Sequence, residues 1–213
     1  MSDTQGTNAM TDLKTVHSDI AFMKALASDG GEVPAIAGAH LLAAGLIYGL
    51  STLMAGAILT GWLDLPRAWA SWAGGAPTLV YLPVMAVLIW LGRHVKGGSA
   101  AKAMAAAWGG IGLVTVTILL SLVAVSWRLH DPRFLVHAWP PVALSLYAGA
   151  WLVFAIVRGR PKWALVTAGC IVSALSAALA TDSQVEWIVM GVSLLAWMAA
   201  PGAVLMWLGR ARG

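Results

Sequence analysis

The sequence predicts an all-α, polytopic integral membrane protein: a six-helix transmembrane bundle preceded by a cytoplasmic amphipathic helix. The chain of 213 residues is 60% hydrophobic and 10% charged, whereas soluble domains are about 45–50% apolar and about 25% charged. Long segments rich in Ala, Leu, Val and Gly follow residue 35, and the predicted spans contain no Asp, Glu, Lys or Arg. Short polar connectors separate these segments. The composition therefore excludes a water-soluble fold.

The first 34 residues are polar, and a helix is predicted there over about residues 11–29. Leu13, Val16, Ile20 and Met23 recur at a spacing of three or four, which places them on one helical face. Residues 1–34 carry two Lys and five Asp or Glu, so their net charge is 2 − 5 = −3, and this sign disfavours anionic lipid. The apolar face has three candidate binding partners: the chain's own basic connectors, a separate membrane or cytosolic protein, and the lipid surface.

The transmembrane domain is predicted over residues 35–213. A hydrocarbon core of about 30 Å requires about 20 apolar residues in a helix. The six predicted spans are 36–63, 72–92, 107–127, 135–157, 163–181 and 187–208. The second is the least regular, because Gly74 and Gly75 lie near its start and Pro83 lies within it. A β-barrel would instead show segments of about 10 residues that alternate apolar and polar side chains, and this pattern does not occur.

The basic residues of the connectors predict the orientation. Eight follow the even-numbered spans, and three lie in the opposite connectors. The first group is Arg93, Lys96, Lys102, Arg158, Arg160, Lys162, Arg210 and Arg212, and the second is Arg67, Arg128 and Arg133. The positive-inside rule assigns the richer side to the cytoplasm. We therefore expect a multi-pass protein of the bacterial inner membrane with both termini in the cytoplasm.

Small residues at a spacing of four predict sites of close helix contact, because they allow two backbones to approach. The candidates are Gly45 and Gly49 in the first span and Gly169, Ser173 and Ala177 in the fifth. Packing within one chain and association between chains both fit this pattern.

Proline occurs inside the even-numbered spans alone, as Pro83, Pro140, Pro141 and Pro201. Together with the basic cluster after each even span, this suggests three helical hairpins repeated in parallel, an arrangement known in some transporters.

The sequence gives no catalytic or cofactor signature. It lacks a nucleophile elbow, a Walker loop, a dinucleotide glycine motif and a His-Glu-x-x-His zinc motif. Cys170 is the single cysteine, and the net charge of 13 − 9 = +4 is too small to indicate nucleic acid. We expect no enzyme activity, no cofactor and no metal.

Four histidines remain as metal-site candidates, because two imidazoles can hold a metal or haem. His40 could approach His94 on the inner side, and His130 could approach His137 on the outer side. The connector from Arg128 to Arg133 is either a simple turn or the mouth of a site for an anionic molecule.

The leading functional hypothesis is a non-catalytic regulatory or accessory subunit that acts through protein contacts. Its amino-terminal helix would bind a partner in or beside the lipid bilayer. The alternative is a carrier or channel for a neutral or lipid-like solute, and a small intramembrane enzyme is a third hypothesis. A carrier requires a polar cavity at mid-depth between the proline-bearing helices. An accessory subunit requires a filled bundle with an exposed apolar or small-residue face.

Overall fold

The computed structural model describes residues 35–93, 99–181 and 183–210, and all regular elements within them are helices. The predicted amphipathic helix lies outside these residues. The elements are α2 (Ala35–Leu59), α3 (Ala68–Gly92), α4 (Ser99–Leu129), α5 (Pro132–Arg158), α6 (Lys162–Leu179), α7 (Val185–Leu194), the π-helix η1 (Leu195–Ala199) and α8 (Ala200–Arg210). The described part contains six helices long and apolar enough to cross a membrane, the last formed by α7, η1 and α8 together. The predicted six-helix class is confirmed.

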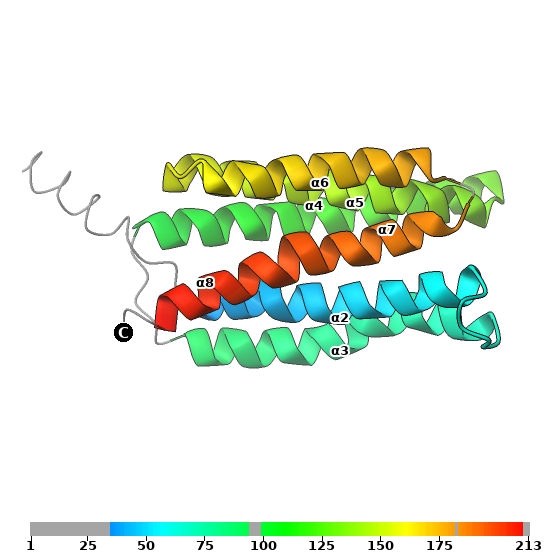
Figure 1. The fold of residues 1–213 in the computed structure, drawn as a ribbon, viewed down its shortest axis with the longest axis horizontal. Coiled ribbons are helices and arrows are strands. Elements are labelled where there is room, and N and C mark those ends of the chain that lie inside the picture. Colours follow the sequence, from blue (N-terminus) through cyan, green and yellow to red (C-terminus); the bar gives the residue numbers. More distant parts are fainter. Residues whose placement is uncertain (1–34, 94–98, 182, 211–213) are drawn as a thin grey trace, which may run out of the picture.

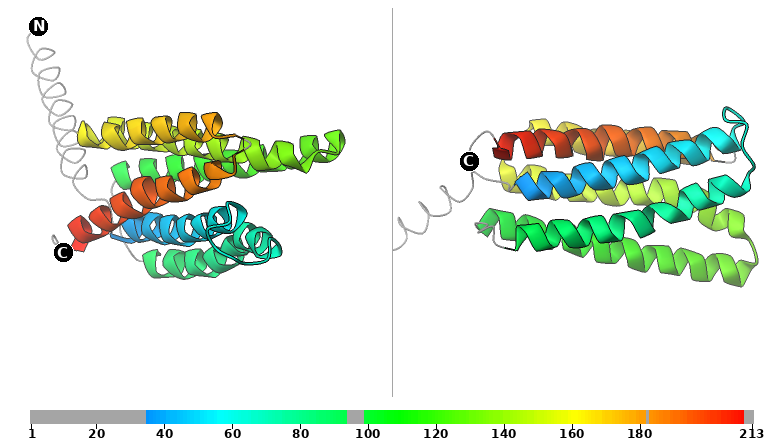
Figure 2. Two further views of the ribbon diagram at one scale, coloured as in Figure 1. Left: turned by 45° about the vertical axis from the view of Figure 1, so that its right-hand side comes forward. Right: turned by 90° about the horizontal axis from the view of Figure 1, so that it is seen from below.

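The helices run lengthwise through an elongated bundle (Figure 1). We call the end at which Ala35 begins α2 and Arg210 ends α8 the proximal end, and the opposite end the distal end. The α2 helix packs against α3 and against the whole of the α7–η1–α8 helix, while α5 packs against α4 and α6. Contacts of α5 and α6 with α7 join these two groups. Consequently α3 and α4 each pack mainly against one neighbour, at the periphery of the bundle (Figure 2).

Several helix boundaries differ from the predicted spans. The first helix ends at Leu59 rather than at residue 63, because Gly61 adopts a left-handed φ of +80° that ends helices readily. The second begins at Ala68 rather than at residue 72 and continues through Pro77 and Pro83. The third begins at Ser99, eight residues before residue 107, although its apolar membrane-spanning part starts at Ala105.

The connector from Arg128 to Arg133 forms a tight link between α4 and α5. The Asp131 side chain caps α5 by accepting a hydrogen bond of 3.0 Å from the backbone N–H of Arg133, and Pro132 occupies the first helical position, which suits its missing N–H. The Ser126 hydroxyl donates a hydrogen bond of 2.8 Å to the Asp131 carbonyl. These contacts explain the roles of Asp131 and Pro132 in the turn.

Pro201 explains the π-helix in the last span. Proline has no N–H, and its ring would clash with the carbonyl of the residue four positions earlier, Trp197. In the turn before it, the N–H of Ala200 bonds to the carbonyl of Leu195, five residues back. One widened turn thus accommodates the proline within a continuous span.

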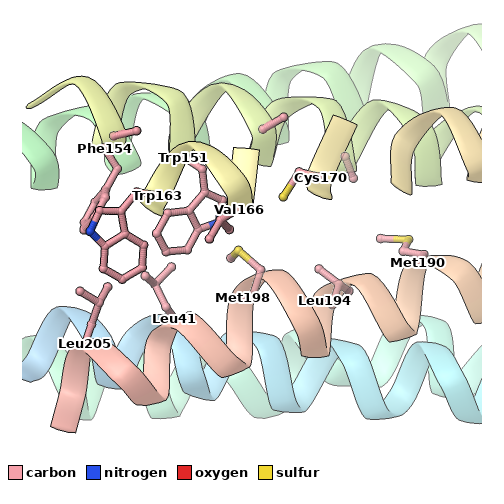
Figure 3. Packing of buried hydrophobic residues seen from close by; sticks show 13 residues of the cluster. Leu41, Trp151, Phe154, Trp163, Val166, Cys170, Met190, Leu194, Met198 and Leu205 are labelled. Atoms are coloured by element: carbon pink, nitrogen blue, oxygen red, sulfur yellow. The ribbon is translucent and has the colours of Figure 1, made fainter. Parts of the chain in front are cut away.

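Aromatic side chains fill the core toward the proximal end (Figure 3). Trp151 of α5 and Trp163 of α6 stack with ring centroids 5.6 Å apart and an interplanar angle of 9°. Phe154 packs edge-on against both indoles. Leu41 and Leu205 belong to the same cluster, so it joins both groups of helices.

Candidate functional site

The predicted partner-binding residues Leu13, Val16, Ile20 and Met23 lie outside the described residues. The predicted packing residues Gly45, Gly49, Gly169, Ser173 and Ala177 are all described. The structure places each of these five in a contact within the chain.

Gly45 and Gly49 form part of the α2 surface that faces the last span. A Cβ atom at Gly45 would overlap the backbone N of Ala199, and one at Gly49 would lie 2.9 Å from the Leu195 side chain. Gly202 contacts the backbone of Leu42 in the same close manner. Glycine is therefore required along this seam because the two backbones nearly touch.

The side chain of Trp197 packs against Gly169 and Ser173 of α6. A Cβ atom at Gly169 would overlap the indole ring, and the indole Nε1–H donates a hydrogen bond of 3.0 Å to the Ser173 hydroxyl. Ala177 is fully buried in a small cluster with Leu144 and Ala174. Trp197 lies in the π-helix, so the widened turn and the small residues of α6 form one contact.

The least covered helices are α3 and α4. Only 6% of the most apolar window of each is buried, compared with 33% to 50% in the other four spans. Five of their glycines would accept a Cβ atom with nothing within 4 Å: Gly74, Gly75, Gly109, Gly110 and Gly112. We call these glycines and the exposed side chains around them the α3–α4 surface. Its small residues, unlike those of α2 and α6, have no partner helix among the described residues.

A buried acid–base pair links α5 to α7 near the distal end. The Nδ1 atom of His137 lies 2.6 Å from Oε1 of Glu186. Glu186 has no exposed surface, and the His137 side chain is 20% exposed. The second carboxylate oxygen, Oε2, is buried and has no hydrogen-bond partner in the described part of the chain. The imidazole therefore offsets part of the unfavourable desolvation of a carboxylate.

This pair corrects one expectation from the sequence. We expected the spans to contain no Asp, Glu, Lys or Arg, because Glu186 directly precedes the predicted span 187–208. The structure includes Glu186 in the first turn of α7 and buries it. Its partner is 49 residues away in sequence, so local patterns do not reveal the pair.

The described residues contain no group of three or more His, Cys, Asp or Glu side chains suited to a metal ion. His94 lies outside the described residues, so its pairing with His40 is not described. His137 contacts Glu186, and His130 occupies the exposed turn before α5 with a φ of 54°.

All three tyrosines of the chain lie near the midpoints of their helices. Tyr48 of α2 and Tyr81 of α3 meet edge to face with ring centroids 5.5 Å apart, and Tyr48 donates a hydrogen bond of 3.2 Å to Oγ1 of Thr78. We call Tyr48, Thr78 and Tyr81 the tyrosine cluster, which joins α2 to α3. Tyr147 of α5 packs against the main buried core, as Tyr48 does.

The phenol hydroxyls of Tyr81 and Tyr147 have no hydrogen-bond partner in the part of the chain that the structure describes. Among the described residues, Tyr81 and Tyr147 make no hydrogen bond through their phenol oxygens, and neither oxygen is sealed inside the protein. Transfer of a hydroxyl into an apolar medium without a hydrogen bond costs about 2–7 kcal/mol. An external group that accepts these bonds would remove that cost.

A separate groove lies between α5 and α6. It has a volume of about 260 Å³, and its lining is apolar apart from two hydroxyl residues, Ser145 and Thr167. The Thr167 hydroxyl is buried without a partner in the described residues, whereas Ser145 donates to the carbonyl of Pro141. The groove is distinct from the tyrosine cluster, because its lining includes no tyrosine.

Comparisons of this chain with protein-family models, with curated proteins and with solved structures give no match.

Proposed function

We propose that this chain is a non-catalytic accessory subunit that binds a transmembrane helix of a different membrane protein through the α3–α4 surface. The observation that supports this proposal is the low coverage of α3 and α4, of which 6% is buried in each spanning window. Lipid can cover exposed leucines, but glycine gains little from lipid and allows another helix backbone to approach. The open glycines of α4, Gly109, Gly110 and Gly112, therefore suit a partner helix better than lipid.

The location belongs to the same proposal: the bacterial inner membrane, with both termini in the cytoplasm. Under this orientation the proximal end of the bundle faces the cytoplasm. The amino-terminal face of Leu13, Val16, Ile20 and Met23 would then provide a second contact on the cytoplasmic side, next to the membrane-embedded one.

Photo-crosslinking in native membranes tests the membrane contact. Benzoylphenylalanine is placed at Leu113 of α4 or, as the control, at Leu165 of α6, which are 70% and 71% exposed. We expect Leu113 to crosslink to one protein, identified by mass spectrometry and by reciprocal purification, and Leu165 to crosslink to lipid alone. Gly110→Leu should abolish the protein crosslink, whereas Val172→Leu on α6 should preserve it. A crosslink to a second copy of this chain, or to lipid alone at both positions, would overturn the accessory role.

The amino-terminal contact is tested separately. Replacing Ile20 and Met23 together by Asp should release the helix, because burial of an uncompensated carboxylate costs several kcal/mol. Membrane insertion should remain intact. A crosslinker at position 20 should label a partner protein in the unsubstituted chain. Crosslinks to the chain's own connectors alone would exclude the partner and indicate docking within the molecule.

A carrier for a neutral or lipid-like solute is the second candidate function. The observation that favours it is that two hydroxyls on the proline-bearing helices, Tyr81 of α3 and Tyr147 of α5, have no hydrogen-bond partner among the described residues. A carrier should accelerate exchange of a fluorescent phospholipid between the two leaflets of reconstituted vesicles. Exchange at the rate of protein-free vesicles would contradict this function for phospholipids.

A further inference from the structure

We infer that α5 and α6 bind one anionic phospholipid, with an acyl chain in the groove between the two helices and the phosphate at the basic connector that joins them. The inference does not depend on the accessory role, because that role concerns α3 and α4. Three features support it: the lining of the groove, the charge of the connector, and the distance between the two.

The α5–α6 groove is apolar and opens on the outer surface of the two helices. Leu152, Ile171 and Leu175 line it and are exposed. Gly149 also lines it, and a Cβ atom at that position would meet nothing within 4 Å. An empty volume of about 260 Å³ would deprive these side chains of dispersion contacts on one side. In a membrane, a hydrocarbon chain is therefore the natural occupant of the groove.

The connector between α5 and α6 selects an anionic headgroup. Arg160 of the connector and Lys162, the first residue of α6, are both exposed at the proximal end. The acidic residues that the structure describes lie toward the distal end, in the α2–α3 connector, the α4–α5 turn and the first turn of α7 (Figure 1): Asp64, Asp131 and Glu186. No described carboxylate therefore neutralises the connector, and a lipid phosphate would supply the opposite charge.

The distance between the connector and the groove matches the reach of one acyl chain. Ser145, at the far end of the groove, precedes Arg158, the last residue of α5, by 158 − 145 = 13 residues. Leu175, at the far end on α6, follows Lys162 by 175 − 162 = 13 residues. At about 1.5 Å per residue, both distances are about 20 Å, which is half the thickness of a bilayer of about 40–45 Å including its headgroups. A phosphate at the connector therefore places the end of an acyl chain in the groove.

Photolabelling of the full-length protein in phosphatidylcholine nanodiscs tests the site. The probe is a phosphatidylglycerol with a diazirine near the end of one acyl chain, and a phosphatidylcholine with the same chain is the neutral comparison. Labelled residues are mapped by mass spectrometry. We expect saturable labelling of the groove by the phosphatidylglycerol probe, and a higher half-saturating content of the neutral probe.

Substitutions in the connector test the contact with the phosphate. Arg160→Gln and Lys162→Gln should each raise the half-saturating content of the phosphatidylglycerol probe about fivefold, the effect of one basic residue on binding to anionic lipid. Arg128→Gln and Arg133→Gln are the matched controls, because they remove exposed charges at the distal end. Both control variants should bind the probe as the unsubstituted protein does.

Substitutions in the groove test the position of the acyl chain. Gly149→Leu should abolish saturable labelling, because the added side chain fills the groove at a position that is open to a Cβ atom. Ser145→Leu, at an exposed position of the same groove, is a second variant with the same expected result. Gly110→Leu, at an equally open glycine of α4, is the control and should preserve labelling. Size-exclusion chromatography checks the fold of each variant.

Three results would overturn the inference. The first is equal labelling by the two probes, which is expected if the acidic residues 1–34 occupy the connector. The second is labelling that neither Arg160→Gln nor Lys162→Gln weakens. The third is saturable labelling that persists in both Gly149→Leu and Ser145→Leu.

Discussion

The Nδ1 atom of His137 and the Oε1 atom of Glu186 lie 2.6 Å apart, joining the second turn of α5 to the first turn of α7. The contact connects the two groups of helices near the distal end. Because Glu186 is fully buried, the imidazole is an important stabilising contact for its carboxylate.

Removal of the histidine should destabilise the bundle. We expect His137→Ala to lower the free energy of unfolding by about 3–5 kcal/mol, because it leaves a buried carboxylate without its imidazole partner. Unfolding of the purified protein in mixed micelles, followed by circular dichroism, measures this change. His130→Ala is the control, because that side chain is exposed and its loss should have little effect.

A double substitution distinguishes two contributions to the loss of stability: the unfavourable burial of an uncompensated carboxylate, and the loss of the favourable contact between His137 and Glu186. Replacing His137 and Glu186 together by Leu removes both polar groups, and replacement of buried pairs by apolar residues is often neutral or stabilising. We expect the double variant to be more stable than His137→Ala. A double variant less stable than the single one would show that the pair contributes more than charge compensation.

The contact between Trp197 and Gly169 gives a third prediction. Gly169→Leu should lower the free energy of unfolding by about 1–3 kcal/mol, the usual range for overpacking, because even a Cβ atom overlaps the indole. Ser173→Leu should also destabilise, since it removes the acceptor of the indole hydrogen bond. Val172→Leu, at a side chain that is 62% exposed, should be neutral. Equal stability of all three variants would contradict this close packing.

The glycines of α2 and α8 should differ from the glycines of α3 and α4. Gly202→Ala should destabilise, because its Cβ atom would overlap the backbone of Leu42, and backbone atoms cannot move aside as a flexible side chain can. Gly75→Ala should be neutral or slightly stabilising in the isolated protein, since the site is open and Ala has the higher helix propensity. Thermal unfolding in detergent compares the two, and a reversed order would contradict the described seam.

Reporter fusions test the predicted orientation. Fusions after Gly98 and after Arg160 should report the cytoplasm, and a fusion after Asp182 should report the periplasm, because basic connectors stay on the cytoplasmic side. A periplasmic signal at either of the first two positions would reverse the assignment.

The hydropathy pattern was sufficient to predict the helical class and six spans, because a segment in lipid must satisfy its backbone hydrogen bonds internally. The helix ends were less predictable. An apolar segment ends where its side chains become polar, whereas the helix α4 begins earlier, at Ser99, and includes residues outside the apolar window. Turn geometry, such as the left-handed Gly61 after α2, also sets these limits.

The candidate sites depended on tertiary structure. The sequence identified Gly45 and Gly169 as candidates for close contact, but only the packing shows that Ala199 and Trp197 occupy these positions while Gly109 and Gly110 stay open. The π-helix before Pro201 and the pairing of His137 with Glu186 could not be predicted from the sequence either. Local sequence determines whether a segment is helical and apolar enough to span the membrane. Which faces meet depends on how helices distant in sequence are arranged, and the burial of Glu186 and the contact between Tyr48 and Tyr81 follow from that arrangement.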